Sequence, residues 1–348
     1  MNEISNDLFL NNSASALQYG LTEGYGPLRE KIAARLKNKC NIGREFDDTI
    51  VVTGGQQCLD LTCKILCNEH DTVICENPSF IGALNAFRAY NTRLCGIPME
   101  EDGIDVAALE KVLKTEKNVK MIYTIPTFQN PMGVCMSLEK RKAVYALAKK
   151  YGVVILEDNP YGELRFKGQD IPTIKSLDTD GIVVYCGSFS KVLSPGIRIG
   201  FVCAPKEIIS KLVVAKQVTD VHTNILCQRI IDGYLEKFDI DEHIASIRDL
   251  YGKKSAAIQE AVKKYLPGTA EVTNPEGGIF LWLDLPGKTD AMEFTRRCMD
   301  KKVAVVPGNS FNCDEEEPSS GVRLNYSMPT FEQIDTAMQK IGEVVKSL

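Results

Sequence analysis

The chain contains the stretch Ser188-Phe189-Ser190-Lys191-Val192-Leu193-Ser194-Pro195-Gly196-Ile197-Arg198-Ile199-Gly200-Phe201, directly after the apolar run 182–186. The apolar run predicts a buried strand, so Lys191 comes just after a strand end. A lysine amine can form an imine with an aldehyde, and nearby serine hydroxyls and an arginine fork can bind a phosphate. This combination indicates a site for pyridoxal 5′-phosphate (PLP).

Composition limits the class of protein. The chain has 348 residues, which is too long for one small core and suits two domains. Hydrophobic residues make up 44% and charged residues 25%, as is usual for a soluble enzyme. The net charge is −5 without a basic block, so we expect no nucleic-acid partner. No apolar run reaches the ~20 residues of a membrane span, so we expect no membrane partner either.

The 12 cysteines indicate the compartment. None forms a C-x-x-C pair, and Cys58, Cys63 and Cys67 would share the apolar face of one helix. We therefore expect reduced core thiols in a cytoplasmic protein, and residues 1–12 lack the apolar region of a secretory signal. The three histidines have no metal-ligand spacing with the cysteines, so no metal site is expected.

Strands and helices alternate from about residue 26 to residue 216. The strand runs are continuously apolar, which is typical of a parallel sheet covered on both faces. The alternation predicts an α/β fold with a large, doubly wound, mostly parallel sheet. The predicted strands are 49–53, 72–75, 120–125, 153–156, 182–186 and 197–203, and the predicted helices include 56–67, 80–89 and 138–150.

The pattern changes after about residue 216. Two helical stretches, 218–237 and 241–265, come before a mixture of strands and helices that ends in a helix over 331–346. This mixture predicts a smaller α+β C-terminal domain joined through a long helix. We divide the chain into an N-terminal arm (1–25), a large PLP-binding domain (26–240) and a small C-terminal domain (241–348).

Three further polar loops follow predicted strands, where ligands bind in open α/β sheets. Gly54-Gly55-Gln56 begins a helix, whose free amides can bind phosphate. Asp158 can keep a ring nitrogen protonated, so that the ring withdraws electrons. Asn130 can donate a hydrogen bond to a phenolate oxygen. Taken alone, the Gly54-Gly55 loop and the Asp158 loop are better explained as ordinary turns, and the Asn130 loop is equally well explained as one.

Two cationic residues also have alternative interpretations. Arg323, on the predicted strand 322–326, can clamp a carboxylate with its planar fork, but most arginines are exposed. Lys191 can be a solvated loop lysine. Against this, the apolar strand predicted at 197–203 is expected to be buried. Arg198 would then be a buried cation, which requires an anion as its partner.

These motifs together resemble the fold-type I (class I and II) PLP-dependent aminotransferases. Within that family they are most similar to the subgroup of 2-aminoadipate and kynurenine aminotransferases and MocR-type regulators. The matching residues are S-x-S-K-x-x-x-P-G-x-R-x-G at 188–200, Gly55-Gln56, Asn130-Pro131, Asp158-x-x-Tyr161 and Arg323. The resemblance covers nearly the whole chain. It implies PLP as cofactor and transfer of an amino group between an L-α-amino acid and a 2-oxo acid.

The resemblance also implies a role for each matching residue. Lys191 forms the imine (Schiff base) with PLP and moves the proton of the substrate Cα, and Asp158 pairs with the ring nitrogen. Around the ring, Asn130 and Tyr161 are implied to contact O3′, and Phe80 the ring face. Tyr19 is implied to contact the partner subunit's phosphate, and Arg323 with Asn130 the substrate α-carboxylate. The residues implied to bind the phosphate are Gly55, Gln56, Ser188, Ser190 and Arg198. The Tyr19 contact implies a homodimer with shared sites.

The chain departs from the family pattern in three places. Phe80 stands where tyrosine is common, and Gly55 where serine or alanine is common. Stacking and the backbone amide survive these changes, but side-chain hydrogen bonds are lost. The family usually carries several dozen more residues before the Tyr19 segment, including a stretch that folds over the substrate, so we expect either a missing lid or a shortened sequence.

Three other functions were weighed against transamination. Another PLP reaction on amino acids, such as β-lyase or decarboxylase chemistry, uses the same cofactor residues and stays open. A non-catalytic regulator-like domain would need a DNA-binding helix-turn-helix, for which the region before Tyr19 is too short. An NAD-dependent enzyme is disfavoured because no G-x-G-x-x-G follows the first strand.

Overall fold

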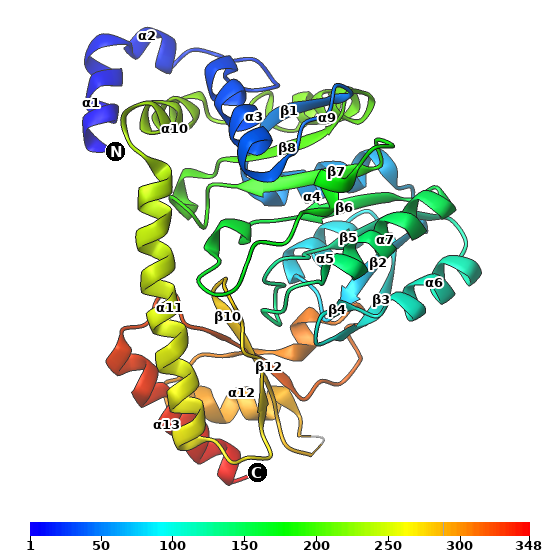
Figure 1. The fold of residues 1–348 in the computed structure, drawn as a ribbon, viewed down its shortest axis with the longest axis vertical. Coiled ribbons are helices and arrows are strands. Elements are labelled where there is room, and N and C mark those ends of the chain that lie inside the picture. Colours follow the sequence, from blue (N-terminus) through cyan, green and yellow to red (C-terminus); the bar gives the residue numbers. More distant parts are fainter. Residues whose placement is uncertain (288) are drawn as a thin grey trace.

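The computed structural model describes residues 1–287 and 289–348. Its largest element is an eight-stranded sheet with the order β1-β8-β7-β6-β5-β2-β3-β4 (Figure 1). These strands are β1 (Asp47–Val52), β2 (Thr72–Asn77), β3 (Arg93–Glu100), β4 (Gly103–Ile104), β5 (Val119–Thr124), β6 (Val154–Asp158), β7 (Val183–Ser188) and β8 (Gly200–Pro205).

Most strands of this sheet end at the same edge. Strands β3, β2, β5, β6 and β7 pair in parallel. Strand β1 has the same direction as β7, because both pair antiparallel with β8. The loops that follow β1, β5, β6 and β7 therefore meet at one edge, which is where open α/β sheets bind ligands.

Helices cover both faces of the large sheet, because successive strand residues point to opposite sides. In β2, Val73 and Cys75 pack in one core with α4 and α5, whereas Ile74 packs in another with α6 and α7. The helices before the second sheet are α1 (Asn2–Asn11), α2 (Ser13–Ala16), α3 (Gly26–Cys40), α4 (Gly54–Leu66), α5 (Ile81–Arg88), α6 (Val106–Thr115), α7 (Leu138–Tyr151), α8 (Ile174–Leu177), α9 (Lys206–Asp220) and α10 (Ile225–Lys237).

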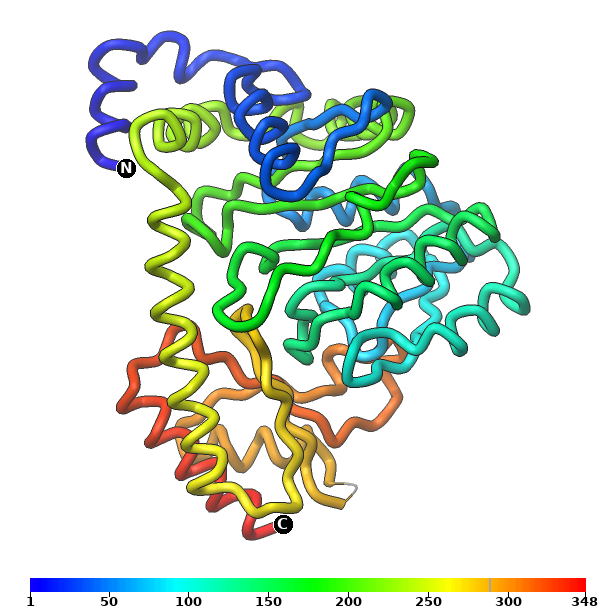
Figure 2. Tube along the Cα trace, viewed as in Figure 1, coloured from blue at the N-terminus to red at the C-terminus, as the bar shows by residue number. Residues whose placement is uncertain are grey.

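A four-stranded antiparallel sheet, in the order β11-β12-β10-β9, forms a second layer. Helix α11 (Ile240–Tyr265) runs beside both sheets (Figure 2). Its Ile240 and Ile244 belong to the core of the large sheet, and Ile258 to the core of the second sheet. The remaining elements are β9 (Glu271–Val272), β10 (Phe280–Asp284), α12 (Ala291–Asp300), β11 (Val306–Pro307), β12 (Gly321–Asn325) and α13 (Phe331–Lys346). The predicted fold class, an α/β sheet with a smaller α+β part, is confirmed.

Two predicted elements were wrong. The helix expected over 218–237 is broken between α9 and α10: Val221 has a positive φ of 63°, and the Asn224 side chain caps α10 by accepting from Cys227 N at 3.0 Å. The strand expected over 197–203 begins only at Gly200. Arg198 precedes it at φ 56°, and its side chain is exposed, so the argument that a buried strand encloses Arg198 fails.

Strands β3 and β4 and helix α6 were not predicted. Gly96 and Pro98 interrupt the apolar pattern of β3, which lies toward the edge of the sheet, where proline is tolerated. In the described part of the chain, no helix combines the length and apolar character needed to cross a membrane. The same residues hold no cluster of three or more metal-ligating side chains.

Candidate active site

Lys191 lies in the loop between β7 and β8, beside two serines that contact each other. Ser188 Oγ and Ser190 Oγ are 2.9 Å apart, and Ser190 N donates to Ser188 Oγ at 3.1 Å. The pKa of Lys191 is lowered, first by burial of its ammonium group and then by the positive charges of Arg323 and Arg198. A lysine with a lowered pKa is more readily neutral, as an amine nucleophile must be.

The first turn of α4 faces Arg198. Arg198 Nη1 donates to Ser190 Oγ and Nη2 donates to Thr53 O, each at 3.4 Å. A Cβ on Gly54 would lie 2.2 Å from Arg198 Nη2, so only glycine allows this approach. The free amides at the start of α4, the serine hydroxyls and the guanidinium therefore surround one position suited to an anion.

Asp158, the last residue of β6, is buried at the same edge. Tyr123 Oη donates a hydrogen bond to its Oδ2 at 3.0 Å. Burial raises the pKa of Asp158 to about 7, although the Tyr123 hydroxyl and the Cys186 thiol act to lower it. A carboxylate that is hard to ionise gains most from a cationic partner, such as a protonated ring nitrogen.

Asn130, Tyr161 and Arg323 form a connected group whose positive charge, on Arg323, also acts on Lys191. Asn130 Nδ2 donates to Tyr161 Oη at 3.4 Å, and Arg323 Nη1 donates to Asn130 Oδ1 at 2.9 Å. The Arg323 guanidinium lies 4.2 Å from the ring centre of Phe280 and 4.9 Å from that of Phe311. These rings hold it by cation–π contact, and its buried Nε has no hydrogen-bond partner among the residues that the structure describes.

Two buried charged residues, Glu76 and Arg141, bind the loop 126–133 that carries Asn130. Glu76 accepts from Ile125 N at 3.2 Å and from Gln129 Nε2 at 3.1 Å. Arg141 donates to Thr127 Oγ1 at 2.9 Å and to a backbone carbonyl of the loop. Because both side chains are fully buried, the loop position of Asn130 is rigidly determined.

Of the other sequence-predicted residues, Phe80, Gln56 and Gly55 lie at the start of α4 or beside it, and Tyr19 lies away from the site. Phe80 and Gln56 both contact Gly82, where a Cβ would be 2.5 Å from Phe80 Cζ and 2.6 Å from Gln56 Oε1. Gly55 lies beside Asp158: a Cβ there would be 3.9 Å from Asp158 Oδ1. Tyr19 is 80% exposed and contacts only the His222 ring among the described aromatic residues, so in the single chain it does not reach the site.

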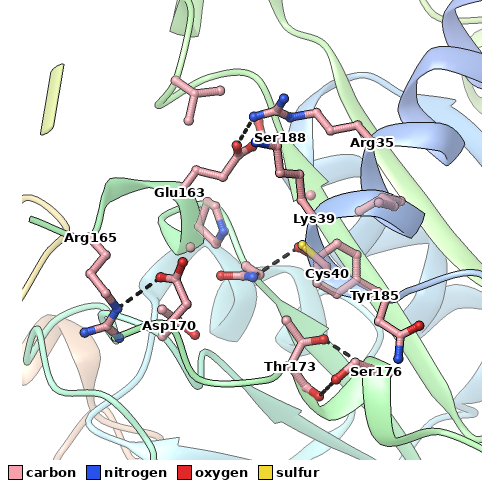
Figure 3. Close-up of a pocket in the computed structure, with 18 of the residues that line it drawn as sticks. Arg35, Lys39, Cys40, Glu163, Arg165, Asp170, Thr173, Ser176, Tyr185 and Ser188 are labelled. Atoms are coloured by element: carbon pink, nitrogen blue, oxygen red, sulfur yellow. Dashed lines mark hydrogen bonds and ion pairs between the residues drawn. The ribbon is translucent and has the colours of Figure 1, made fainter. Parts of the chain in front are cut away.

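A cavity of about 720 Å³ adjoins the lysine segment without being this site (Figure 3). Ser188, Tyr185 and Glu163 line it, but Lys191, Asp158, Asn130 and Arg323 do not. Its charged groups are mostly paired with each other. Arg35 contacts Glu163 and Asp241, and Arg165 contacts Asp170.

Sequence reasoning missed four residues of the site. Tyr123 and Cys186, which contact Asp158, lie inside apolar strands, and Phe280 and Phe311, which enclose Arg323, look like core residues. The only usable signal was position, since Tyr123 and Cys186 are near the ends of strands that flank β6.

The fold and the site together define a PLP-dependent transferase of fold type I. The family described as aminotransferase class I and II matches residues 3–341. The chain belongs to this family and is a PLP-dependent aminotransferase.

Individual relatives agree with this assignment. The chain is 38% identical to aromatic-amino-acid aminotransferase 1 of Thermococcus litoralis, covering 99% of this chain and 83% of the relative. It is 37% identical to 2-aminoadipate transaminase of Thermus thermophilus, covering 96% and 82%. The crystal structure of Pyrococcus horikoshii kynurenine aminotransferase superposes with a TM-score of 0.96 at 37% identity, covering 99% of this chain and 86% of that one.

Proposed function

We propose that this chain moves an amino group between an L-α-amino acid and a 2-oxo acid through PLP bound covalently to Lys191. The carrying observation is that the positive charges of Arg198, in the anion cradle, and of half-buried Arg323 both act on half-buried Lys191. The cradle suits the cofactor phosphate, and Arg323 suits the substrate α-carboxylate. Incubation of the PLP-loaded protein with aromatic amino acids, 2-aminoadipate and kynurenine, each with 2-oxoglutarate, tests this; no 2-oxo acid product from any donor would contradict transamination.

The residues present fit PLP. Among the described residues, Arg198 contacts hydroxyl and carbonyl oxygens but no carboxylate, so its charge is available to a phosphate. Ser188 and Ser190 add hydroxyl donors, and the Gly55 and Gln56 amides belong to the open first turn of α4. Arg323 Nε is buried and has no partner in the described part of the chain, and a substrate carboxylate can supply one.

Each residue has a distinct task in this proposal. When bound, PLP supplies an electron-withdrawing ring that stabilises negative charge at the substrate Cα. Asp158 holds a proton on the ring nitrogen, and Asn130 and Tyr161 donate to the ring O3′. Lys191 Nζ takes the proton from the substrate Cα, a task that its lowered pKa favours. Phe80 packs against the ring face and fixes its orientation.

Replacing Arg323 with leucine should weaken substrate binding more than cofactor binding. Removing one partner of a buried charge pair typically costs 2–5 kcal/mol, so the donor KM should rise by roughly 100-fold. PLP affinity should change little, because Arg323 is not part of the phosphate cradle. Steady-state kinetics of Arg323→Leu beside Arg297→Leu, an exposed arginine on α12 paired with Glu293, measures this; an unchanged KM in Arg323→Leu would contradict the carboxylate role.

We also propose a homodimer in which Tyr19 reaches the partner's phosphate site. The support is an exposed apolar surface, the arm patch, on the N-terminal arm and α9. It comprises Leu17, Tyr19, Leu21, Val214, Val218 and Val221, each at least 48% exposed. The Tyr19–His222 contact places the arm against the segment after α9. Exposed apolar side chains gathered in this way are typical of a protein interface.

A charge in the arm patch should therefore break the dimer. For Val218→Asp, light scattering should give a mass near 38.6 kDa instead of twice that value, because a buried unpaired carboxylate opposes association. Turnover should fall with the dimer, since Tyr19 acts on the partner's site. Met299→Asp, equally polar but on α12, should leave the mass unchanged; a monomeric wild-type chain with full activity would contradict the shared site.

Two further statements are proposals. We propose a cytoplasmic location, supported by the 12 free thiols, which suit a reducing compartment. We also keep the division into an arm (1–25), a large domain (26–240) and a small domain (241–348). It is supported by the two cores of the two sheets, although the first turns of α11 and the residues Ile279 and Phe280 belong to the core of the large sheet.

A further inference from the structure

The Asp158 carboxylate is flanked by side chains from the strands on both sides of its own. On β5, Tyr123 Oη donates to Asp158 Oδ2 at 3.0 Å. On β7, Cys186 is the register partner of Asp158, and its thiol donates to Gly55 O at 3.7 Å. All three side chains are buried. The carboxylate therefore has one fixed donor, the Tyr123 hydroxyl, before any ligand binds.

Tyr123 is a rigid donor. Its side chain is fully buried, and its ring packs edge-on against Phe87 with ring centres 5.3 Å apart. Burial, together with the nearby Asp158 charge, raises the pKa of Tyr123 well above its usual value. The phenol therefore stays protonated and acts only as a donor toward Asp158.

The Tyr123 contact distinguishes the two carboxylate oxygens. Oδ2 accepts from Tyr123, whereas Oδ1 lies 3.9 Å from the point that a Cβ on Gly55 would occupy. Gly55 is in the first turn of α4, which forms the phosphate cradle. Oδ1 is thus the oxygen on the cofactor side of the carboxylate.

We propose that Tyr123 is a positioning residue for transamination: it binds Asp158 Oδ2 and so presents Oδ1, ionised, to the cofactor ring nitrogen. This inference rests on the Asp158 role proposed above. Without the hydroxyl, the carboxylate is free to rotate and becomes more basic, so it draws the proton away from the ring nitrogen. The ring then withdraws electrons less well, which slows the Cα–H step and not substrate binding.

The matched pair of variants is Tyr123→Phe and Tyr185→Phe, each in the PLP-loaded protein. Tyr185 is a buried tyrosine on β7, and its hydroxyl accepts from Asn159 Nδ2 at 3.1 Å. Among the described residues it has no hydrogen bond to Asp158. Both changes delete one buried hydroxyl, so a general loss of stability would affect both variants.

Two readouts separate positioning from mere structure. The ¹⁵N chemical shift of ¹⁵N-labelled PLP should report a protonated ring nitrogen in the wild type and in Tyr185→Phe, and a shift toward the unprotonated value in Tyr123→Phe. The Tyr123→Phe kcat should fall by about 10-fold or more, the usual effect of losing a hydrogen bond to a charged group, with the donor KM within about threefold. Replacement of Tyr123 by 3-fluorotyrosine, which keeps the hydroxyl, should give the wild-type ¹⁵N chemical shift and the wild-type kcat.

Each other outcome overturns the inference. A Tyr123→Phe protein with wild-type shift and kcat shows that Tyr123 does not position Asp158. A 3-fluorotyrosine variant as impaired as Tyr123→Phe shows that ring packing matters and the hydroxyl does not. An unprotonated ring nitrogen in the active wild type refutes the Asp158 assignment itself, and failure of the wild type to bind PLP at Lys191 refutes the proposed function.

Discussion

Replacing Lys191 with alanine is expected to abolish transamination while leaving the fold intact. The general-base part of its task alone typically contributes about 10²–10⁴-fold, and the covalent link to PLP is lost as well. Lys191 is only half-buried, and it forms no ion pair among the described residues. Its removal therefore leaves no buried charge without a partner. Turnover assays, and thermal unfolding compared with the wild type, measure the two effects.

The covalent link can be tested directly. Borohydride reduction of the PLP-loaded wild type, followed by peptide mass mapping, should place the label on Lys191 alone. Lys211→Ala, an exposed lysine on α9, serves as the control and should keep both label and activity. A label on another lysine, or an active Lys191→Ala protein, would show that the cofactor residue has been misassigned.

Asp158→Asn should retain PLP but lose most of its turnover. The phosphate cradle is unchanged, so the affinity for PLP should fall only modestly. Asparagine cannot hold a proton on the ring nitrogen, and removing one preorganised electrostatic group typically lowers kcat by about 10²–10³-fold. Cofactor titration and steady-state kinetics measure the two quantities separately. Full activity in Asp158→Asn would show that the ring-nitrogen contact is wrong.

The same variant should change how stability depends on pH. Burial raises the pKa of Asp158 to about 7, well above that of an exposed aspartate, so the folded cofactor-free chain holds a proton that the unfolded chain releases. The extra proton makes a contribution to the free energy of unfolding that is present at low pH and is lost as the pH rises toward 7. Above about pH 7, cofactor-free Asp158→Asn should be the more stable protein, by up to a few kcal/mol. Denaturant unfolding at about pH 5 and pH 8 checks this; a pH-independent difference would contradict it.

The chemistry of the site was largely readable from the sequence, because it depends on residue types in a fixed order along the chain. Lys191 with its serines and Arg198, the Gly54-Gly55 turn, Asn130 and Asp158 each follow a strand, and parallel strands end at one edge. The structure brings these residues together, and Arg323 joins them through Asn130. The role of Tyr19 depends on a second subunit and stays a prediction.

Backbone conformation was less readable. Val221 follows α9 with a positive φ, inside a stretch that the sequence predicted as one continuous helix over 218–237. Arg198 takes a left-handed conformation before β8 instead of joining the strand. Both cases are local departures that contacts elsewhere impose, and neither residue type signals them.

The sequence by itself predicted the groups of the proposed site: an amine, a phosphate cradle and a carboxylate at or after strand ends, and an arginine on a late strand. Only the tertiary structure decided how those groups are tuned. The Tyr123 contact to Asp158 and the two rings around Arg323 come from strands and loops distant in sequence. Burial and hydrogen bonding set the charge state of a group, and both arise only when separate strands pack side by side.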